Sequence, residues 1–337
     1  MHQRHRDGNE VEAGVIGGMA SDLEALVDRL TGRRKLHVAF EATGGILWIF
    51  DLLVARFGRQ RVHVAQPRRI RAIANSREKN DANDAWWLAY LTYEGRLPES
   101  FIPTGALREL RIATRERIAT VQARTKVKVR LRAHLLQMGV RLPTVKIDTL
   151  KGWAFLQQLV IDTPGTRGMA LKSLLLRFEH LEEAVADWDA EIERLAESFE
   201  AVRTLEREAP GVGTVLAATI AAEAWPIQRF RTPKAFARYT GLTPSDRSTS
   251  GRQIHGAITR EGSSYLRWAL TQAVMACLRA KRGPSVAAGN WVRAKQRRMG
   301  CKAKARTAGA RKLAEQVWRL FNLGECFDPQ RPFGSAA

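Results

Sequence analysis

Cysteine is scarce in this chain of 337 residues, and long apolar runs are absent. The three cysteines, Cys277, Cys301 and Cys326, form no Cys-x-x-Cys pair, which argues against a zinc ribbon and a disulfide framework and is typical of reduced cytosolic thiols. No apolar run approaches the roughly 18 residues of a spanning helix, and the first residues lack the apolar core of a signal peptide. We therefore expect a cytoplasmic protein with no membrane partner.

Acidic residues are outnumbered as well, with 34 Asp and Glu against 55 Lys and Arg. The formal net charge is +21 and the pI is about 10.8. Such an excess favours a polyanionic partner, with nucleic acid as the first candidate and an anionic membrane surface as the second. The length is typical of roughly two or three domains, and a hydrophobic content of 45% is enough to build their cores.

Residues 35–95 alternate between strand and helix patterns. A hydrophobic strand, Leu36–Phe40, ends at Glu41, an apolar helix spans Ile46–Phe57, and a second strand covers Arg61–Ala65. This alternation predicts a mostly parallel sheet with helices on its faces, where ligands gather at the carboxyl ends of the strands. Glu41 lies at such an end.

Two further acids open the next helix. Asp81 and Asp84 are three positions apart and share one helix face. Oxygen ligands suit Mg²⁺, and two such ions can clamp the attacking and leaving oxygens of a phosphodiester. The spacing is compatible with a metal site built from Glu41, Asp81 and Asp84. The alternative is a turn carboxylate at Glu41 and two acids that only favour the helix dipole.

Cations follow the second strand and crowd a long helix. Arg68, Arg69 and Arg71 come after the strand end, on the same rim as Glu41, and indicate a phosphate contact or a solvated helix face. From Leu107 to Gln137 there is no Gly or Pro, and apolar residues recur at helical spacing. We expect the basic face of this helix to contact a nucleic-acid backbone. Its central cations are Arg124, Lys126, Lys128 and Arg130.

An acidic counterpart follows this helix. Residues 144–168 read as irregular, and a second long helix with many Glu residues covers Met169–Glu208. This helix can pair with the basic one as an antiparallel hairpin, with another subunit as a coiled coil, or within a plain bundle.

The C-terminal third contains two further candidate sites. The turn with Gly211 and Gly213 resembles a helix-hairpin-helix element, whose backbone N–H groups can hold phosphate, although a turn between two helices needs no ligand. In the loop 245–252, hydroxyls stand between Arg247 and Arg252. A serine that attacks a phosphodiester needs such neighbours; the alternative is a polar surface loop.

Seven short blocks, taken in order, resemble insertion-sequence transposases of the IS110 type. The blocks are residues 40–45, 66–71, 79–85, 95–98, 210–213, 239–244 and 256–262. The resemblance runs from about Asp7 to Ala314. It implies a DNA recombinase with an N-terminal RuvC-like DEDD domain and a C-terminal serine-bearing domain. It further implies Mg²⁺ held by four carboxylates, a serine that attacks DNA covalently, dimers that pair into tetramers, and, in some members, a structured guide RNA.

Glu41, Asp81 and Asp84 match three of the family's four carboxylates. The first Asp has no counterpart, because only six residues precede the turn at Asp7–Glu10, and we expect the opening strand to be missing. Either the chain starts late or it is a decayed copy. The hypothesis that follows is a recombination-deficient polypeptide, which robust Mg²⁺-dependent DNA cleavage would contradict.

The nucleophile has three candidates. Matching without gaps from Gly241 places Thr249 at the family's serine position, and a shift of one residue gives Ser248 or Ser250. A threonine hydroxyl is more hindered, so a serine is preferred. Ser250 ranks slightly above Ser248 because it keeps the Ser-Gly pair.

The sequence thus predicts four regions. Residues 1–97 form an incomplete RuvC-like α/β domain, 98–208 a long-helix coiled coil, 209–325 an all-α serine-bearing domain, and 326–337 a tail. The expected function is that of a nucleoid-associated DNA transposase. The alternatives are a RuvC-like nuclease or resolvase without a covalent intermediate, and a non-catalytic nucleic-acid-binding protein.

Overall fold

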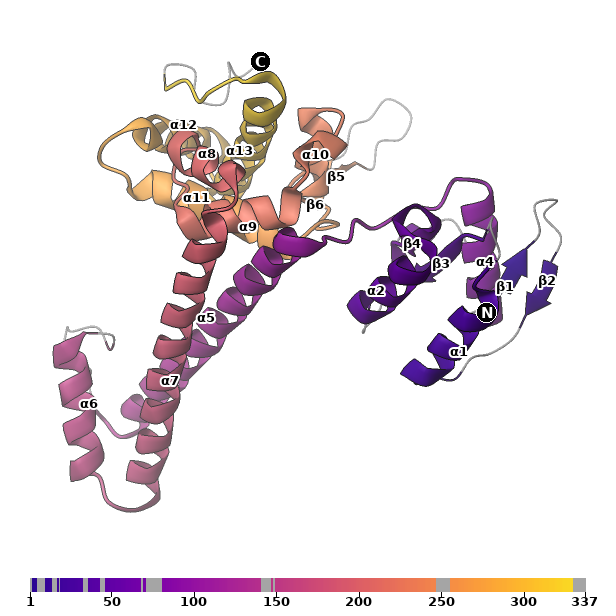
Figure 1. Ribbon diagram of the computed structural model, residues 1–337. Coiled ribbons are helices and arrows are strands. Elements are labelled where there is room, and N and C mark those ends of the chain that lie inside the picture. The colour runs from indigo at the N-terminus through magenta and orange to yellow at the C-terminus, as the bar shows by residue number, and fades with distance from the viewer. Residues whose placement is uncertain are drawn as a thin grey trace. The chain divides into compact units, whose positions relative to one another are not determined.

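A computed structural model shows two compact units, Met1–Pro103 and Thr104–Ala337 (Figure 1). Within them the structure describes residues 2–4, 10–13, 17, 19–32, 36–42, 46–67, 69–70, 81–140, 147, 149–246 and 255–329. Arg68, Arg71 and the whole segment 247–254, with both candidate serines, lie outside the described residues.

The first unit contains the predicted parallel strand pair. β3 (Val38–Glu41) pairs with β4 (Val62–Ala65), and the register aligns Glu41 with Ala65. α2 (Ile46–Phe57) and the short 3-10 helix η1 (Arg59–Arg61) connect the two strands. The segment 98–100 extends this sheet: the Gln66 N–H donates to the Pro98 carbonyl at 2.8 Å and the Ser100 N–H to the Val64 carbonyl at 2.7 Å.

The two faces of this sheet differ. Because side chains alternate along a strand, Val38 and Phe40 lie on one face and Glu41 on the other. The first face packs in a core with α1 (Ala20–Leu30) and α2. The fully or nearly buried members of that core are Val27, Leu30, Phe50, Leu53, Phe57, Val62, Val64 and Ile102. α4 (Asp81–Tyr93) contacts β3 but contributes no residue to this core.

The N-terminal hairpin does have a strand before its turn. β1 (His2–Arg4) pairs antiparallel with β2 (Glu10–Ala13), so the prediction that the opening strand is missing is wrong. Strand pairing is a tertiary property here, because three polar residues carry no hydrophobic pattern that would announce a strand. None of the three is an aspartate, and the first carboxylate of the family's set remains unmatched.

Two long helices dominate the second unit. α5 (Gly105–Gln137) and α7 (Gly165–Ala196) run side by side (Figure 1). The predicted irregular stretch contains α6 (Leu150–Asp162), whose first turn is capped by the Thr149 hydroxyl, and that prediction is wrong. No described helix is both long and apolar enough to cross a membrane.

The remaining helices build the largest core. α8 (Glu200–Glu208) is separate from α7, and α9 (Thr214–Ala224) is buried from Ala217 to Ala224. The same core includes α10 (Pro233–Tyr239), α11 (Ser264–Arg279), α12 (Pro284–Met299) and α13 (Lys302–Leu323), with the 3-10 helix η2 (Ile227–Arg229). Within it, α9 packs against α5, α7, α8 and α11. The Ala-rich composition of α9 allows this close approach from several sides.

The sequence predicted an all-α C-terminal domain, and this prediction is wrong because the region contains two strands. β5 (Pro244–Asp246) and β6 (His255–Ile258) form an antiparallel ribbon. The ribbon brackets residues 247–254, so the candidate nucleophiles belong to the connection between two paired strands.

Candidate active site and nucleic-acid contacts

The carboxylates of the first unit come from two neighbouring elements. Glu41 is the last residue of β3, on the face opposite the core, and Asp84 lies in the first turn of α4; both are partly buried. Asp81 opens α4, but its side chain lies outside the described residues. Since α4 contacts β3, the topology brings the elements that carry Glu41 and Asp84 together.

The donor chemistry fits Mg²⁺, while the geometry of the three acids stays a prediction. Carboxylate oxygens are the ligands that Mg²⁺ prefers, and neither Glu41 nor Asp84 forms an ion pair in the part of the chain that the structure describes. Among the described side chains, no group of three His, Cys, Asp or Glu residues could hold a metal ion.

Arg69 is the described member of the predicted Arg68, Arg69 and Arg71 cluster. It is exposed just beyond the carboxyl end of β4, and its backbone N–H donates to the Gln66 carbonyl at 3.1 Å. The β3–β4 register aligns Glu41 with the last residue of β4. Arg69 therefore lies at the rim of the sheet that carries Glu41.

A chain of two histidines and a glutamate crosses the same sheet and was missed from the sequence. His37 Nδ1 lies 2.9 Å from His63 Nε2, and His63 Nδ1 lies 2.7 Å from Glu99 Oε1. Burial, the nearby His63 and Arg61 lower the pKa of His37. The His63–Glu99 contact ties the segment around Glu99, near the end of the first unit, to β4. His37, His63 and Glu99 are far apart in sequence, so no local spacing reveals their contacts.

The basic face of α5 is partly neutralised inside the second unit. Arg117 pairs with Asp189 at 2.8 Å and Arg124 with Glu182 at 3.0 Å, so acids of α7 meet cations of α5. Of the three pairings that the sequence left open, these contacts show the antiparallel hairpin of α5 with α7. Arg124 is therefore already engaged, whereas Lys126 and Arg130 are exposed. The Lys128 ammonium lies 5.2 Å from the centre of the Phe178 ring.

Gly211 has a packing role. Its N–H donates to Ser285 Oγ at 2.9 Å, and its φ is +73°. An added Cβ would lie 2.3 Å from the Ala273 carbonyl oxygen, so only glycine lets this turn lie against α11. Because its amide is used inside the chain, Gly211 is not free to bind phosphate. Gly213, the N-cap of α9, is exposed and stays a candidate.

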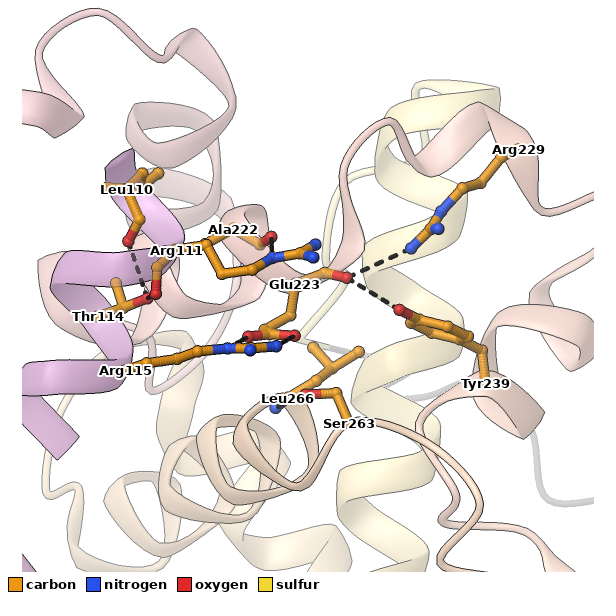
Figure 2. Close-up of polar contacts among 10 residues, drawn as sticks. All are labelled: Leu110, Arg111, Thr114, Arg115, Ala222, Glu223, Arg229, Tyr239, Ser263 and Leu266. Carbon is orange, nitrogen blue, oxygen red and sulfur yellow. Dashed lines mark hydrogen bonds and ion pairs between the residues drawn. The ribbon is translucent and has the colours of Figure 1, made fainter. Parts of the chain in front are cut away.

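A buried carboxylate organises the second unit (Figure 2). Glu223, in the last turn of α9, is 2% exposed and accepts two hydrogen bonds from Arg115, at 2.7 and 3.1 Å. The backbone carbonyl of Glu223 accepts from Arg229 and from the Tyr239 hydroxyl, both at 3.3 Å. The Ala222 carbonyl accepts from Arg111 Nε at 2.7 Å.

Electrostatics explains this arrangement. Cations near the carboxyl end of a helix are stabilised by its dipole, and a buried carboxylate needs a charged partner. Burial lowers the pKa of Arg111. Burial also acts to lower the pKa of Arg115, but the hydrogen bond and charge of Glu223 outweigh it and raise that pKa. Since a guanidinium is not deprotonated in proteins, both arginines stay charged.

The Glu223 network also holds the two stems of the serine-bearing ribbon. Tyr239 ends α10, just before β5, and the Arg115 guanidinium lies 4.8 Å from the centre of the Tyr265 ring in the first turn of α11, just after β6. Arg267 of α11 donates to the Thr240 carbonyl at 3.1 Å. One sequence signal was available: a lone acid inside the apolar run 215–224 demands a partner.

Comparison with known families decides the identity. The DEDD transposase model of the IS110 type matches residues 4–140, and the model of the IS116/IS110/IS902 transposase family matches residues 204–288. The chain belongs to the IS110 family of insertion-sequence transposases. Within this IS110-family transposase, the first match covers β3, α4 and their carboxylates, and the second covers Glu223 and the ribbon.

Similar proteins are also named as transposases. A probable family 20 transposase of Pseudomonas aeruginosa is 27% identical over 75% of each chain. A putative transposase of Sinorhizobium fredii, y4pF/y4sB, is 27% identical over 86% of this chain and 74% of its own. The transposase for insertion sequence element IS1328 of Yersinia enterocolitica is 25% identical over 81% of this chain and 80% of its own.

Replacing Glu223 by Gln should destabilise the second unit by about 3 kcal/mol, because Arg115 loses the buried carboxylate that accepts its two hydrogen bonds. Denaturant unfolding of the full chain measures the change. Glu191→Gln is the matched control, since it removes an exposed partner of Arg194 on α7 and should leave the midpoint unchanged. Equal shifts for both variants would contradict a special role of Glu223.

Proposed function

We propose that this transposase cuts and rejoins DNA strands at the ends of its element. The carboxylates of the first unit hold Mg²⁺, and a serine of the segment 247–254 attacks the DNA. The observation that supports this best is that β3 and α4, the two elements with these acids, contact each other inside the segment matched by the DEDD transposase model. A structured guide RNA is a further polyanionic partner within the proposal.

Glu41, Asp81 and Asp84 are the proposed metal ligands. An ion held by these carboxylates would supply charge neutralisation and polarisation of the phosphodiester. Arg69, together with Arg68 and Arg71, positions the phosphate at the rim of the sheet. On α5, Lys126 and Arg130 are the exposed cations that contact the DNA backbone.

The serine step belongs to the second unit. The Oγ of Ser250, or of Ser248, forms a bond to phosphorus as the bond to the leaving deoxyribose oxygen breaks. The serine hydroxyl gives its proton to water, and the leaving oxygen takes up a proton from water to become a free hydroxyl. Arg247 and Arg252 hold the phosphate oxygens during this exchange. Contacts of Tyr239 and Tyr265 with the Glu223–Arg115 network hold the helices that precede β5 and follow β6.

A second copy of the chain is the proposed partner of the long helices. Val129 and Leu136 on α5 are 59% and 78% exposed, and Met169 and Leu176 on α7 are 75% and 56% exposed. Each pair is seven residues apart and therefore shares a helix face. The Arg117–Asp189 and Arg124–Glu182 ion pairs set the antiparallel register of the two helices. In this register Val129 lies level with Leu176, and Leu136 lies level with Met169. Apolar stripes of this spacing are typical of coiled-coil contacts.

Glu41→Gln and Asp84→Asn should each reduce Mg²⁺-dependent cleavage of element-end DNA by about 100-fold or more, because a neutral amide is a poor metal ligand. Calorimetric titration with Mg²⁺ should show the loss of binding directly. Glu94→Gln, an exposed acid just beyond α4, is the control and should keep both properties. If the unaltered chain binds DNA yet cuts none, it is a nucleic-acid-binding remnant, as the unmatched first Asp anticipates.

Ser250→Ala should abolish the covalent protein–DNA adduct that survives denaturant, whereas Ser248→Ala should keep it. Gel electrophoresis of end-labelled DNA trapped on the protein measures the adduct, and Thr249→Ala completes the set. Loss in Ser248→Ala alone would move the nucleophile by two residues. Cleavage without an adduct in the unaltered chain would favour the resolvase-like alternative and sink the serine route.

Replacing both Leu136 and Met169 by Lys should convert dimers to monomers, because like charges would then face each other across the apolar stripes. Light scattering coupled to size-exclusion chromatography measures the mass. Ile112→Lys, at the other end of α5 and also exposed, is the control and should stay dimeric. A monomeric unaltered chain at micromolar concentration would refute this part of the proposal.

A further inference from the structure

Positive charge is concentrated in one C-terminal stretch. From Gly262 to Ala314 the chain contains no Asp or Glu, so every cation there adds to the net charge. The thirteen cations of this stretch are Arg267, Arg279, Lys281, Arg282, Arg293, Lys295, Arg297, Arg298, Lys302, Lys304, Arg306, Arg311 and Lys312. They supply +13 of the formal net charge of +21.

Four of these cations lie at the corner between α12 and α13. Arg297 and Arg298 end α12, Gly300 reverses the chain with a φ of +61°, and Lys302 and Lys304 open α13. All four side chains are exposed. We call these four residues the basic corner.

The helices behind the basic corner are held close together. An added Cβ at Gly289 of α12 would lie 2.3 Å from the Cys277 carbonyl oxygen of α11, and one at Gly309 of α13 would lie 2.8 Å from Val292 of α12. Glycines at these positions let three helices pack at short distance. Val292 and Ala305 are fully buried beneath the corner. The corner is therefore a rigid support for its charges.

The charges of the basic corner have no counter-charge among the described residues. None of the four forms an ion pair in the part of the chain that the structure describes, in contrast to Arg117 and Arg124 of α5. The first turn of α13 contains no acid, although the positive end of a helix dipole favours acids and disfavours cations. Lys302 and Lys304 thus oppose the stability of their own helix, which points to an anion outside the chain.

We propose that the basic corner is a contact site for the phosphate backbone of a double-stranded nucleic acid, independent of its base sequence. Point charges on a fixed corner match the regular spacing of backbone phosphates, and they neutralise charge without reading bases. This inference rests on the proposed function for its choice of partner. It assigns a large share of the electrostatic affinity to α12 and α13 instead of α5.

The test compares two variants of the full chain with equal loss of charge. In one, Arg297, Arg298, Lys302 and Lys304 are all replaced by Gln. In the matched control, two other arginines and two other lysines, all exposed on α6 and α7, are replaced: Lys151, Arg167, Lys172 and Arg177. Circular dichroism melts check that both variants fold like the unaltered chain.

Binding of a short duplex of scrambled sequence is titrated across a range of salt concentrations. The corner variant should bind about 100-fold more weakly near physiological salt, and the slope of log affinity against log salt should fall by roughly 3 to 4. The control should lose less than about threefold, since only its long-range charge has changed. Equal losses in the two variants would overturn the proposal.

Duplex DNA and duplex RNA of equal length form the two arms of the titration. A weaker affinity of the corner variant for either duplex supports the contact and identifies the source of the phosphates. An unchanged affinity for both duplexes overturns it. Cleavage is scored separately. A chain that never cuts DNA but shows the corner effect fails only the proposed function, whereas a chain that cuts DNA with an unchanged salt slope in the corner variant fails only this inference.

Cys301 offers an independent readout at the same corner. It is the N-cap of α13, and the backbone N–H of Lys304 lowers the pKa of its thiol, which favours alkylation. Bound duplex should slow alkylation of Cys301 but not of Cys326, which is exposed and whose carbonyl accepts a hydrogen bond from Gln316 in the second half of α13, away from the corner. Cys277 is buried, with its pKa raised to about 11, and stays unreactive. Equal rates at Cys301 with and without duplex would contradict the contact.

Discussion

The second unit depends on one buried carboxylate, Glu223, and its bidentate contact with Arg115. A charge with 2% exposure is stable only when a partner of opposite sign compensates its lost hydration. Arg115 supplies that partner from α5, the helix through which the chain enters this unit. The core around α9 can therefore close only when α5 is in place, and α5 in turn fixes Tyr265 at the start of α11. The ion pair links the first helix of the unit to the stems of its candidate serine loop.

The charge of the protein is divided between two uses. On the long helices, acids of α7 meet cations of α5, and these ion pairs set the register of an antiparallel hairpin. In α11, α12 and α13 no acid accompanies the cations before Glu315, which pairs with Arg311 and Lys312. A net charge of +21 alone does not locate a polyanion. The pairing pattern does so, because it separates the cations that stabilise the fold from those with no internal partner.

Local pattern explains what could be predicted from the sequence. The β3–α2–β4 segment has apolar strands, an apolar helix and a terminal Gly58, and α5 has neither Gly nor Pro in its interior after Gly105. These features depend on neighbours in the chain, so reading the sequence was enough. It also placed Glu41 at the end of β3 and the candidate serines in a polar loop, although it predicted neither β5 nor β6.

Contacts between distant residues explain what was missed. Glu223 and Arg115 are 108 positions apart, and His63 and Glu99 are 36 apart. β1 has three polar residues and exists only through its pairing with β2. The role of Gly211 was misread for the same reason: a glycine that lets a turn lie against α11 and a glycine that exposes an amide to phosphate look identical in sequence. Only the position of Ser285 and Ala273 separates them.

The basic corner implies a link between binding and stability. Cations in the first turn of a helix cost on the order of 0.3–1 kcal/mol each, and like charges held on a rigid support add to that cost. A ligand that binds only the folded chain returns free energy in proportion to its occupancy, so a polyanion that neutralises Lys302 and Lys304 stabilises α13. Because α13 packs against α10, α11 and α12, this stabilisation reaches the core that holds Glu223. The chain is therefore expected to be most stable in its nucleic-acid complex, where the unbalanced charge of its C-terminal helices is neutralised.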